Sequence, residues 1–234
     1  MNSPLQVCPK CRDTGWEIRP VAEITIAVRC ECQQRTKADK LSAQAQIPPR
    51  YQRCTFAAYQ TRDLSQRIAK QSLETMVRLY PHTQGALLMG TPGVGKTHLA
   101  VAALHALIQQ KRVPCLFVDF VAFLNLVQST YSKKSDRVKE EIIRPVLTTD
   151  VVLIDDLGSF QTTAWVLDTM TYIINERYNH HKVTLLTTNW FDPDVQPRHE
   201  TTLEERIGSR LRSRLCEMCQ TIVIGGQDYR RQAS

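Results

Sequence analysis

The feature that most constrains this chain is a glycine-rich segment at residues 90–97, which reads Gly-Thr-Pro-Gly-Val-Gly-Lys-Thr. It fits the pattern G-x-x-x-x-G-K-[ST] and lies between an apolar run at 86–89 and an apolar stretch at 99–104. Glycines let the backbone wind tightly, so that several N–H groups and a helix N-terminus face phosphate oxygens. The spacing therefore predicts a strand, a phosphate-binding loop and a helix, with a nucleoside triphosphate as the ligand.

Two side chains of this loop have predicted roles of their own. Lys96 adds a compact positive charge, and Thr97 supplies the hydroxyl that usually ligates Mg²⁺ in such loops. The predicted nucleotide-binding residues of this segment are Gly90, Thr91, Pro92, Gly93, Val94, Gly95, Lys96, Thr97 and His98.

Two adjacent acids, Asp155 and Asp156, follow four apolar residues at 151–154. Such a run is typical of a strand buried on both faces of a parallel sheet, and ligand sites lie at the C-terminal ends of these strands. We expect Asp155 to hold Mg²⁺ through water and Asp156 to polarise the attacking water. An ordinary turn is the alternative.

A third apolar strand is expected at 183–188, and Asn189 follows it. An amide at this place can orient the attacking water. Asparagine also commonly begins turns, but the position after two nucleotide-site strands favours a functional role.

These three segments resemble Walker A, Walker B and sensor 1 of AAA+ ATPases. Finer matches at 155–158, 173–178 and 187–189 look like the DnaC/IstB group of helicase loaders and transposition helpers, and the resemblance extends over residues 47 to 231. It implies an α/β fold, with a parallel sheet flanked by helices, and a Mg²⁺-dependent, switch-type ATPase.

The resemblance gives a role to the basic segment at 205–215, which is similar to the family's box VII, where an arginine reaches into a neighbour's ATP site. Arg214 is the preferred finger and Arg210 the second. Together with Arg206 they recur every four residues and would share one helical face. A solvated or DNA-facing helix is the alternative. Because no arginine is evident near the phosphate loop, we expect an ATP-dependent homo-oligomer.

The segment 225–231 is similar to the family's short terminal motif, in which the arginine after tyrosine, here Arg230, serves as sensor 2. Asp228 stands where family members often carry serine, and a disordered basic tail is the alternative. Only twenty residues follow Arg214, so we expect neither a full helical lid nor an appended DNA-reading domain.

Near the N-terminus, two cysteine pairs have the spacing of metal ligands: Cys8 with Cys11, and Cys30 with Cys32. Four thiolates can close a tetrahedron around Zn²⁺, and the metal then supplies folding energy that so short a segment lacks. The second pair is tighter than the common spacing. Disulfides are the alternative, disfavoured because no secretion signal or membrane span is evident, which indicates a cytoplasmic protein.

The predicted organisation is a zinc ribbon at 1–32, a helical linker at 33–55 and an AAA+ ATPase domain at 56–234. A strand is expected at 24–28, with Trp16 filling a miniature ribbon core. An amphipathic helix that covers the first core strand is expected at 64–80.

The net charge of +7 favours contact with nucleic acid. Tyr131, Lys133 and Lys134 are the best local candidates, since the family's corresponding region faces single-stranded DNA and an aromatic ring can stack on a base. A solvated loop is an equally good explanation.

The leading hypothesis is a DnaC-like helicase loader that binds a hexameric replicative helicase and single-stranded DNA. The second is an IstB-like transposition helper that binds duplex DNA and a transposase. A DNA-binding zinc protein with a vestigial ATP site is a third class, disfavoured by the intact motif residues.

Overall fold

The computed structural model describes residues 8–12, 14–21, 24–131, 136–160, 163–195 and 201–231. Its centre is a parallel five-stranded sheet with the strand order β4-β5-β6-β3-β7. The strands are β3 (Gly85–Met89), β4 (Cys115–Asp119), β5 (Val151–Leu157), β6 (Val183–Thr188) and β7 (Cys219–Val223). The three strands that the sequence predicts are the three inner ones.

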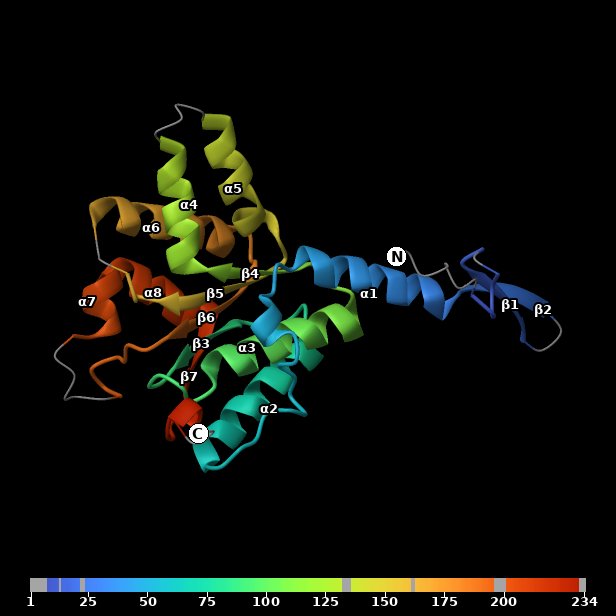
Figure 1. The fold of residues 1–234 in the computed structure, drawn as a ribbon, viewed down its shortest axis with the longest axis horizontal. Helices are drawn as coiled ribbons and strands as arrows, with labels where there is room; N and C mark the ends of the chain where they lie inside the picture. The colour runs from blue at the N-terminus through green and yellow to red at the C-terminus, as the bar shows by residue number, and fades with distance from the viewer. Residues whose placement is uncertain are drawn as a thin grey trace.

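Helices cover both faces of this sheet (Figure 1). One face packs against α2 (Leu64–Leu79) and α3 (Lys96–Ala106), which a π-helical turn, η2 (Leu107–Lys111), extends. The other face packs against α4 (Phe120–Tyr131), α5 (Asp136–Thr148), α6 (Ala164–Asn179), α7 (Leu203–Ile207) and α8 (Ser209–Met218). This is the α/β architecture that the sequence predicts.

The apolar runs of the inner strands supply both cores, because successive side chains of a strand point to opposite faces. In β3, Ala86 and Leu88 pack with α2 and α3, whereas Leu87 and Met89 pack on the side of α4 and α6. An uninterrupted apolar strand is therefore required here, where an alternating strand would leave one face polar.

The predicted amphipathic helix is α2, whose Leu73, Met76 and Val77 are buried. It packs on α3 and on the edge strand β7, and its buried residues share an apolar cluster with Ala86 and Leu88 of the first core strand.

The N-terminal part consists of a hairpin, β1 (Trp16–Val21) and β2 (Ile24–Arg29), followed by α1 (Glu31–Gln44) and a short 3₁₀ helix, η1 (Pro49–Tyr51). Helix α1 projects from the sheet edge and carries the hairpin at its outer end (Figure 1).

The inner end of α1 belongs to the core of the ATPase. Ala38, Leu41 and Ala45 are buried in the cluster that contains α2 and α3, and Phe117 N–H of β4 donates to Ala45 O at 2.8 Å. The predicted linker is thus anchored to the sheet, while the three domain boundaries stay a prediction.

The hairpin differs from the expected miniature core. Trp16 is 49% exposed, with the Arg29 guanidinium 5.9 Å from its ring centroid, and Ile18 is 75% exposed. The expectation that Trp16 fills a core is therefore wrong, because a two-stranded hairpin has no second layer to bury the ring.

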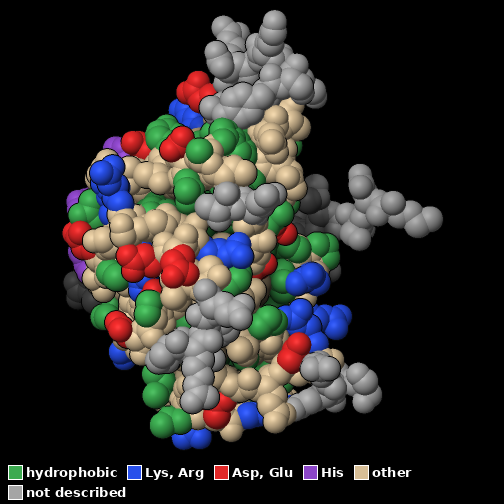
Figure 2. Space-filling view, turned by 90° about the vertical axis from the view of Figure 1, so that its left-hand side faces the viewer, with side chains coloured by type: hydrophobic (Ala, Val, Ile, Leu, Met, Phe, Trp, Pro, Cys, Tyr) green, Lys and Arg blue, Asp and Glu red, His purple; other side chains and the backbone are tan. Residues whose placement is uncertain are grey.

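Charged side chains are mixed on the side of the molecule that carries α7. There, Lys and Arg side chains lie interspersed with Asp and Glu side chains (Figure 2). In the described part of the chain, no helix is long and apolar enough to cross a membrane.

Candidate functional site

The predicted nucleotide-binding residues meet at the C-terminal ends of β3, β5 and β6. A cavity of about 680 Å³ opens there, and its walls include the phosphate loop, Asp155, Asp156 and Asn189. This edge of a parallel α/β sheet is where ligands of such folds bind.

The phosphate loop has the tight left-handed turns that its glycines permit. Gly93 has φ +81°, and Gly95, with φ +95°, is the N-cap of α3. A Cβ at Gly93 would lie 1.8 Å from Asp228 Oδ1, so any larger residue would displace the Asp228 side chain. Tyr59 O–H donates to Val94 O at 3.1 Å and holds the loop from the other side.

Lys96 is almost fully buried within this loop. Its Nζ donates to Gly90 O at 2.7 Å, to Thr91 O at 2.9 Å and to Asn189 Oδ1 at 2.7 Å. Burial lowers the pKa of Lys96 to about 8, although the charges of Asp156 and Asp155 oppose this shift. The cation is therefore held by neutral acceptors, which phosphate oxygens can replace.

Asp155 accepts two hydroxyl hydrogen bonds at the same oxygen. Thr97 Oγ1 donates to Asp155 Oδ1 at 2.8 Å, and Thr187 Oγ1 donates to it at 2.6 Å. Burial raises the pKa of Asp155, and the two hydroxyls counteract that shift. The two predicted magnesium ligands, Thr97 and Asp155, are thus adjacent oxygen donors of the kind that Mg²⁺ prefers.

Asp156 has an unusual backbone conformation. Its φ is +63°, and the β5–β6 register shifts between Ile154 and Leu157. Aspartate tolerates the left-handed region better than most residues. The bulge re-aims its side chain, so that Asp155 and Asp156 both reach the cavity where a regular strand would turn one of them away.

Asn189 connects two of these groups. Its Oδ1 accepts from Lys96 Nζ, and its Nδ2 donates to Asp156 Oδ1 at 2.9 Å. Thr187 supports the same arrangement, since Asp156 N–H donates to Thr187 Oγ1 at 2.9 Å. Thr187 was not among the predicted site residues, although a threonine at the C-terminal end of the strand beside the Walker B strand was a usable signal.

The C-terminal segment is ordered against the phosphate loop, which contradicts the alternative of a disordered tail for the residues up to 231. Tyr229 N–H donates to Gly93 O at 3.2 Å, and Tyr229 O–H bonds to Gln66 Oε1 at 2.8 Å. Arg230 lines the cavity, with its Nε 3.5 Å from Asp228 Oδ1. The predicted sensor 2 residue therefore lies at the site.

A second arginine at the cavity, Arg50, was not among the predicted site residues. Arg50 lines it, together with Tyr51 of the same 3₁₀ helix. The expectation that no arginine lies near the phosphate loop is therefore wrong for both Arg50 and Arg230. Neither is adjacent to the loop in sequence, so only tertiary packing brings them there.

The arginines of the box VII segment do not share one helical face. Gly208, with φ +84°, separates α7 from α8. Arg206 therefore lies on a different helix, where its Nη1 donates to Gly158 O and Phe160 O at 3.0 Å and its guanidinium lies 4.0 Å from the Trp190 ring centroid. Two carbonyl oxygens and an aromatic ring thus contact this guanidinium within its own chain.

Helix α8 carries the two predicted fingers. Arg214 donates to Asn175 Oδ1 of α6, whereas Arg210 is exposed. Between them, Arg212 is buried and paired with Asp192, which lies three residues after Asn189. This ion pair anchors α8 to the loop that follows the predicted sensor 1 residue.

The four N-terminal cysteines come together at the start of α1. Their sulfur atoms all lie within 4.8 Å of one another, with Cys8 and Cys30 at 3.8 Å and Cys11 and Cys32 at 3.3 Å. Four thiolates bonded to zinc at about 2.3 Å would be about 3.8 Å apart, so this donor set fits a zinc ion. All eight cysteines fall within the described ranges, and none of them forms a disulfide.

One of the predicted DNA-contacting residues, Tyr131, is the last residue of α4. Lys133 and Lys134 lie outside the described residues.

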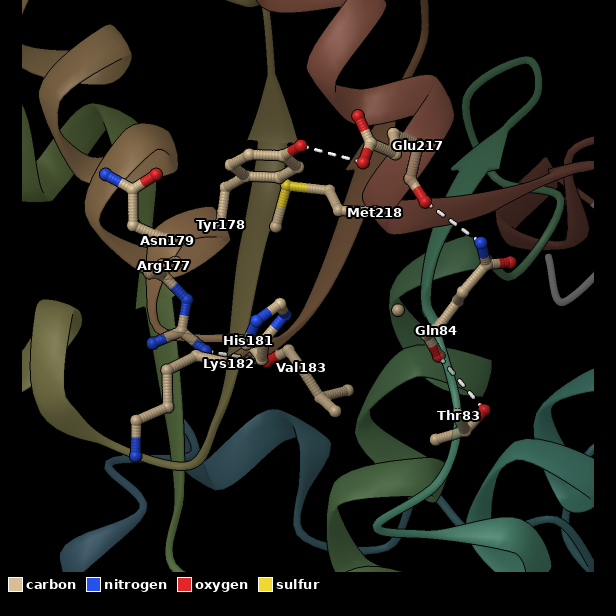
Figure 3. A pocket seen from close by; sticks show the side chains of 11 residues that line it. Thr83, Gln84, Arg177, Tyr178, Asn179, His181, Lys182, Val183, Glu217 and Met218 are labelled. Carbon is tan, nitrogen blue, oxygen red and sulfur yellow. Dashed lines mark hydrogen bonds between the residues drawn. The ribbon is translucent and has the colours of Figure 1, made fainter.

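A second cavity, of about 420 Å³, lies at the N-terminal ends of β3 and β6, opposite the nucleotide cavity (Figure 3). Tyr178 O–H donates to Glu217 Oε1 at 2.7 Å there, and Gln84 Nε2 donates to Glu217 O at 2.9 Å. The buried Arg177 guanidinium donates to carbonyls of Val146, Thr149 and Val183, and burial lowers its pKa to about 10. No predicted site residue lines this cavity.

The parallel sheet, the phosphate loop and the acids beside it define a P-loop ATPase of the AAA+ class. The family described as "IstB-like ATP binding protein" matches residues 12–234. The chain belongs to this family, whose members bind ATP.

Relatives with known names agree with this assignment. The chain superposes on the crystal structure of a DnaC helicase loader with a TM-score of 0.68 and 30% identity, over 76% of this chain and 99% of that one. It is 26% identical to the replicative helicase loader DnaI of Bacillus subtilis (strain 168), over 87% of this chain and 67% of the relative. It is 27% identical to the phage-like element PBSX protein XkdC of the same organism, over 95% and 84% of the two chains.

Proposed function

We propose that the protein is an ATP-dependent helicase loader that binds a hexameric replicative helicase and single-stranded DNA. The observation that carries this proposal is the match to a DnaC helicase loader over 99% of that chain at 30% identity. The similarity to DnaI, which extends over 87% of this chain, supports it.

The cavity supports Mg²⁺-dependent hydrolysis of ATP. Lys96 and the loop amides would hold the phosphates, Thr97 and Asp155 the Mg²⁺, and Asp156 with Asn189 would orient and polarise the attacking water. When bound, Mg²⁺ neutralises charge that develops on the phosphates. Arg230 would act as sensor 2 from the same subunit.

The remaining roles require an assembly. Arg214 or Arg210 of one subunit would reach the ATP site of its neighbour in a homo-oligomer, and release of that contact after hydrolysis would make the protein a switch. Arg210 is better placed for this in the single chain, because Arg214 is bonded to Asn175. Tyr131, Lys133 and Lys134 stay our proposed contacts to single-stranded DNA.

The cysteine cluster is proposed to bind zinc, with Cys8, Cys11, Cys30 and Cys32 as ligands. It would stabilise the hairpin, whose exposed Trp16 and Ile18 offer an apolar surface at the outer end of α1. We assign this end of the molecule to helicase capture.

The second candidate function is that of an IstB-like transposition helper, which would assemble on duplex DNA and engage a transposase. The family match over residues 12–234 favours it. The ATP site would serve either function equally.

The test uses purified Asp156→Asn, expected to trap bound ATP, with Lys96→Ala as the variant that does not hold ATP. Each variant is mixed with the replicative helicase of the organism that carries the gene. In a separate experiment, each variant is mixed with duplex DNA and a transposase encoded beside that gene. Retention of helicase by Asp156→Asn alone, with transfer of the helicase to single-stranded DNA by the wild type, is the expected result. Filaments on duplex DNA that recruit transposase, without helicase binding, would refute the loader.

A further inference from the structure

The 3₁₀ helix η1 forms one wall of the nucleotide cavity. Tyr51 is half-buried, and its ring packs against Phe117 of β4 with the centroids 5.7 Å apart. Burial raises the pKa of Tyr51, and the negative charge of Asp155 raises it further. Tyr51 lines the cavity together with the two predicted magnesium ligands, Thr97 and Asp155.

Arg50 is held at the mouth of this cavity by the same tyrosine. Its Cζ lies 4.3 Å from the centroid of the Tyr51 ring, and its Nη2 donates to the Tyr51 hydroxyl. Arg50 is exposed, and it forms no ion pair with any acid in the part of the chain that the structure describes. By contrast, Arg230 at the same cavity already has Asp228 as a partner.

A cation without an acidic partner at this place suits a phosphate ligand. A planar guanidinium binds phosphate oxygens through two hydrogen bonds, and such charge-assisted bonds are among the stronger ones in proteins. Three acids, Asp119, Asp155 and Asp156, also line the cavity, so an added cation offsets their repulsion of an anionic nucleotide.

We propose that Arg50 contacts the terminal phosphate of a bound nucleoside triphosphate and thereby couples the nucleotide to helix α1. This inference rests on the proposed ATP binding and adds a residue and a regulatory route to it.

The route to α1 is short. Ala45, which follows α1, accepts the hydrogen bond from Phe117 N–H of β4, and only residues 46–48 separate it from η1. Cys30 and Cys32 lie at the other end of α1. A nucleotide that holds Arg50 would therefore restrain the inner end of the helix that bears the cysteine cluster.

The first test is a titration of full-length protein with fluorescent ADP and with a fluorescent, slowly hydrolysed ATP analogue, both with Mg²⁺. Arg50→Ala should bind the triphosphate about tenfold more weakly, because a charged hydrogen bond is lost. Its affinity for the diphosphate should change less than about twofold. The matched control is Arg53→Ala, an exposed arginine of the same segment that does not line the cavity.

The second test is hydrogen exchange of the backbone amides at 45–51. The triphosphate analogue should slow their exchange in the wild type and in Arg53→Ala but not in Arg50→Ala. Retained ADP affinity shows that Arg50→Ala is folded. If Arg50→Ala does not fold, Arg50→Lys takes its place in both tests. Unchanged triphosphate affinity, or an equal loss for both nucleotides, would overturn the proposal. A protein that passes both tests yet engages no helicase would refute only the loader function.

Discussion

Asn189 Oδ1 accepts a hydrogen bond from Lys96 Nζ at 2.7 Å. The other end of the same amide donates to Asp156 Oδ1 at 2.9 Å. This bridge is possible because β6, which Asn189 follows, lies between β3 and β5 in the sheet. The side chain that follows the middle strand therefore links the cation of the phosphate loop to the proposed water-polarising carboxylate.

Replacing Asp156 by asparagine should slow ATP turnover by about 10²- to 10⁴-fold, because an amide cannot take a proton from water. Nucleotide affinity should change little, since Lys96 and the loop amides stay in place. Steady-state hydrolysis and fluorescent-nucleotide titration measure the two quantities. Asp168→Asn, an exposed acid of α6, is the control. Wild-type turnover in the Asp156 variant would show that another group acts on the water.

Nucleotide affinity should fall as the pH rises above about 8. The pKa of Lys96 is lowered to about 8 by burial, and an anionic phosphate needs the protonated amine. Below this pH the amine is charged and the nucleotide affinity is constant. Above it, nucleotide binding takes up a proton, so the affinity falls by at most about tenfold per pH unit. Lys96→Arg stays charged and should give a flat profile between pH 7 and pH 9. Equal slopes for the two proteins would exclude Lys96 as the titrating group.

Purified protein should contain one zinc ion per chain, and Cys30→Ser should lose it, because four thiolates are needed to close the tetrahedron. Elemental analysis by mass spectrometry measures the metal content. Cys216→Ser removes an exposed thiol elsewhere and should leave the zinc content unchanged. An equal metal content in the two variants would contradict the assignment of the cluster. The ATPase core, which does not include the four clustered cysteines, should retain its unfolding midpoint in Cys30→Ser.

Replacing Arg177 by methionine should lower the free energy of unfolding by about 3 kcal/mol, because buried carbonyl groups lose their donor. Chemical denaturation monitored by circular dichroism tests this. Arg78→Met, an exposed residue of α2, should change stability by less than about 0.5 kcal/mol. A similar small change for Arg177→Met would mean that water replaces the guanidinium at the edge of the second cavity.

Much of the nucleotide site was predictable, because its residues are local in sequence or lie at strand ends. The loop 90–97, Asp155, Asp156 and Asn189 each follow an apolar strand, and parallel strands bring their C-terminal ends to one edge. Arg50 and Tyr59 were not predictable in this way. Their roles depend on which distant segments pack beside the loop.

Two local features misled the sequence analysis. The four-residue spacing of Arg206, Arg210 and Arg214 predicted one helical face, but Gly208 ends α7 and starts a new helix. Trp16 was assigned to a core, yet the hairpin has no covering layer. Spacing implies a shared face only when the helix is continuous, and aromatic content implies a core only when a second layer exists.

The sequence by itself determined the class of fold and the ligand, because glycine conformation, strand apolarity and the placement of acids are local properties of the chain. The tertiary structure alone decided what surrounds these residues. It brought Arg50 to the cavity from a segment distant from the phosphate loop in sequence, and it tied α1 to the edge strand β4 through Ala45. Such contacts follow from the packing of whole elements against one another, and no local pattern encodes them.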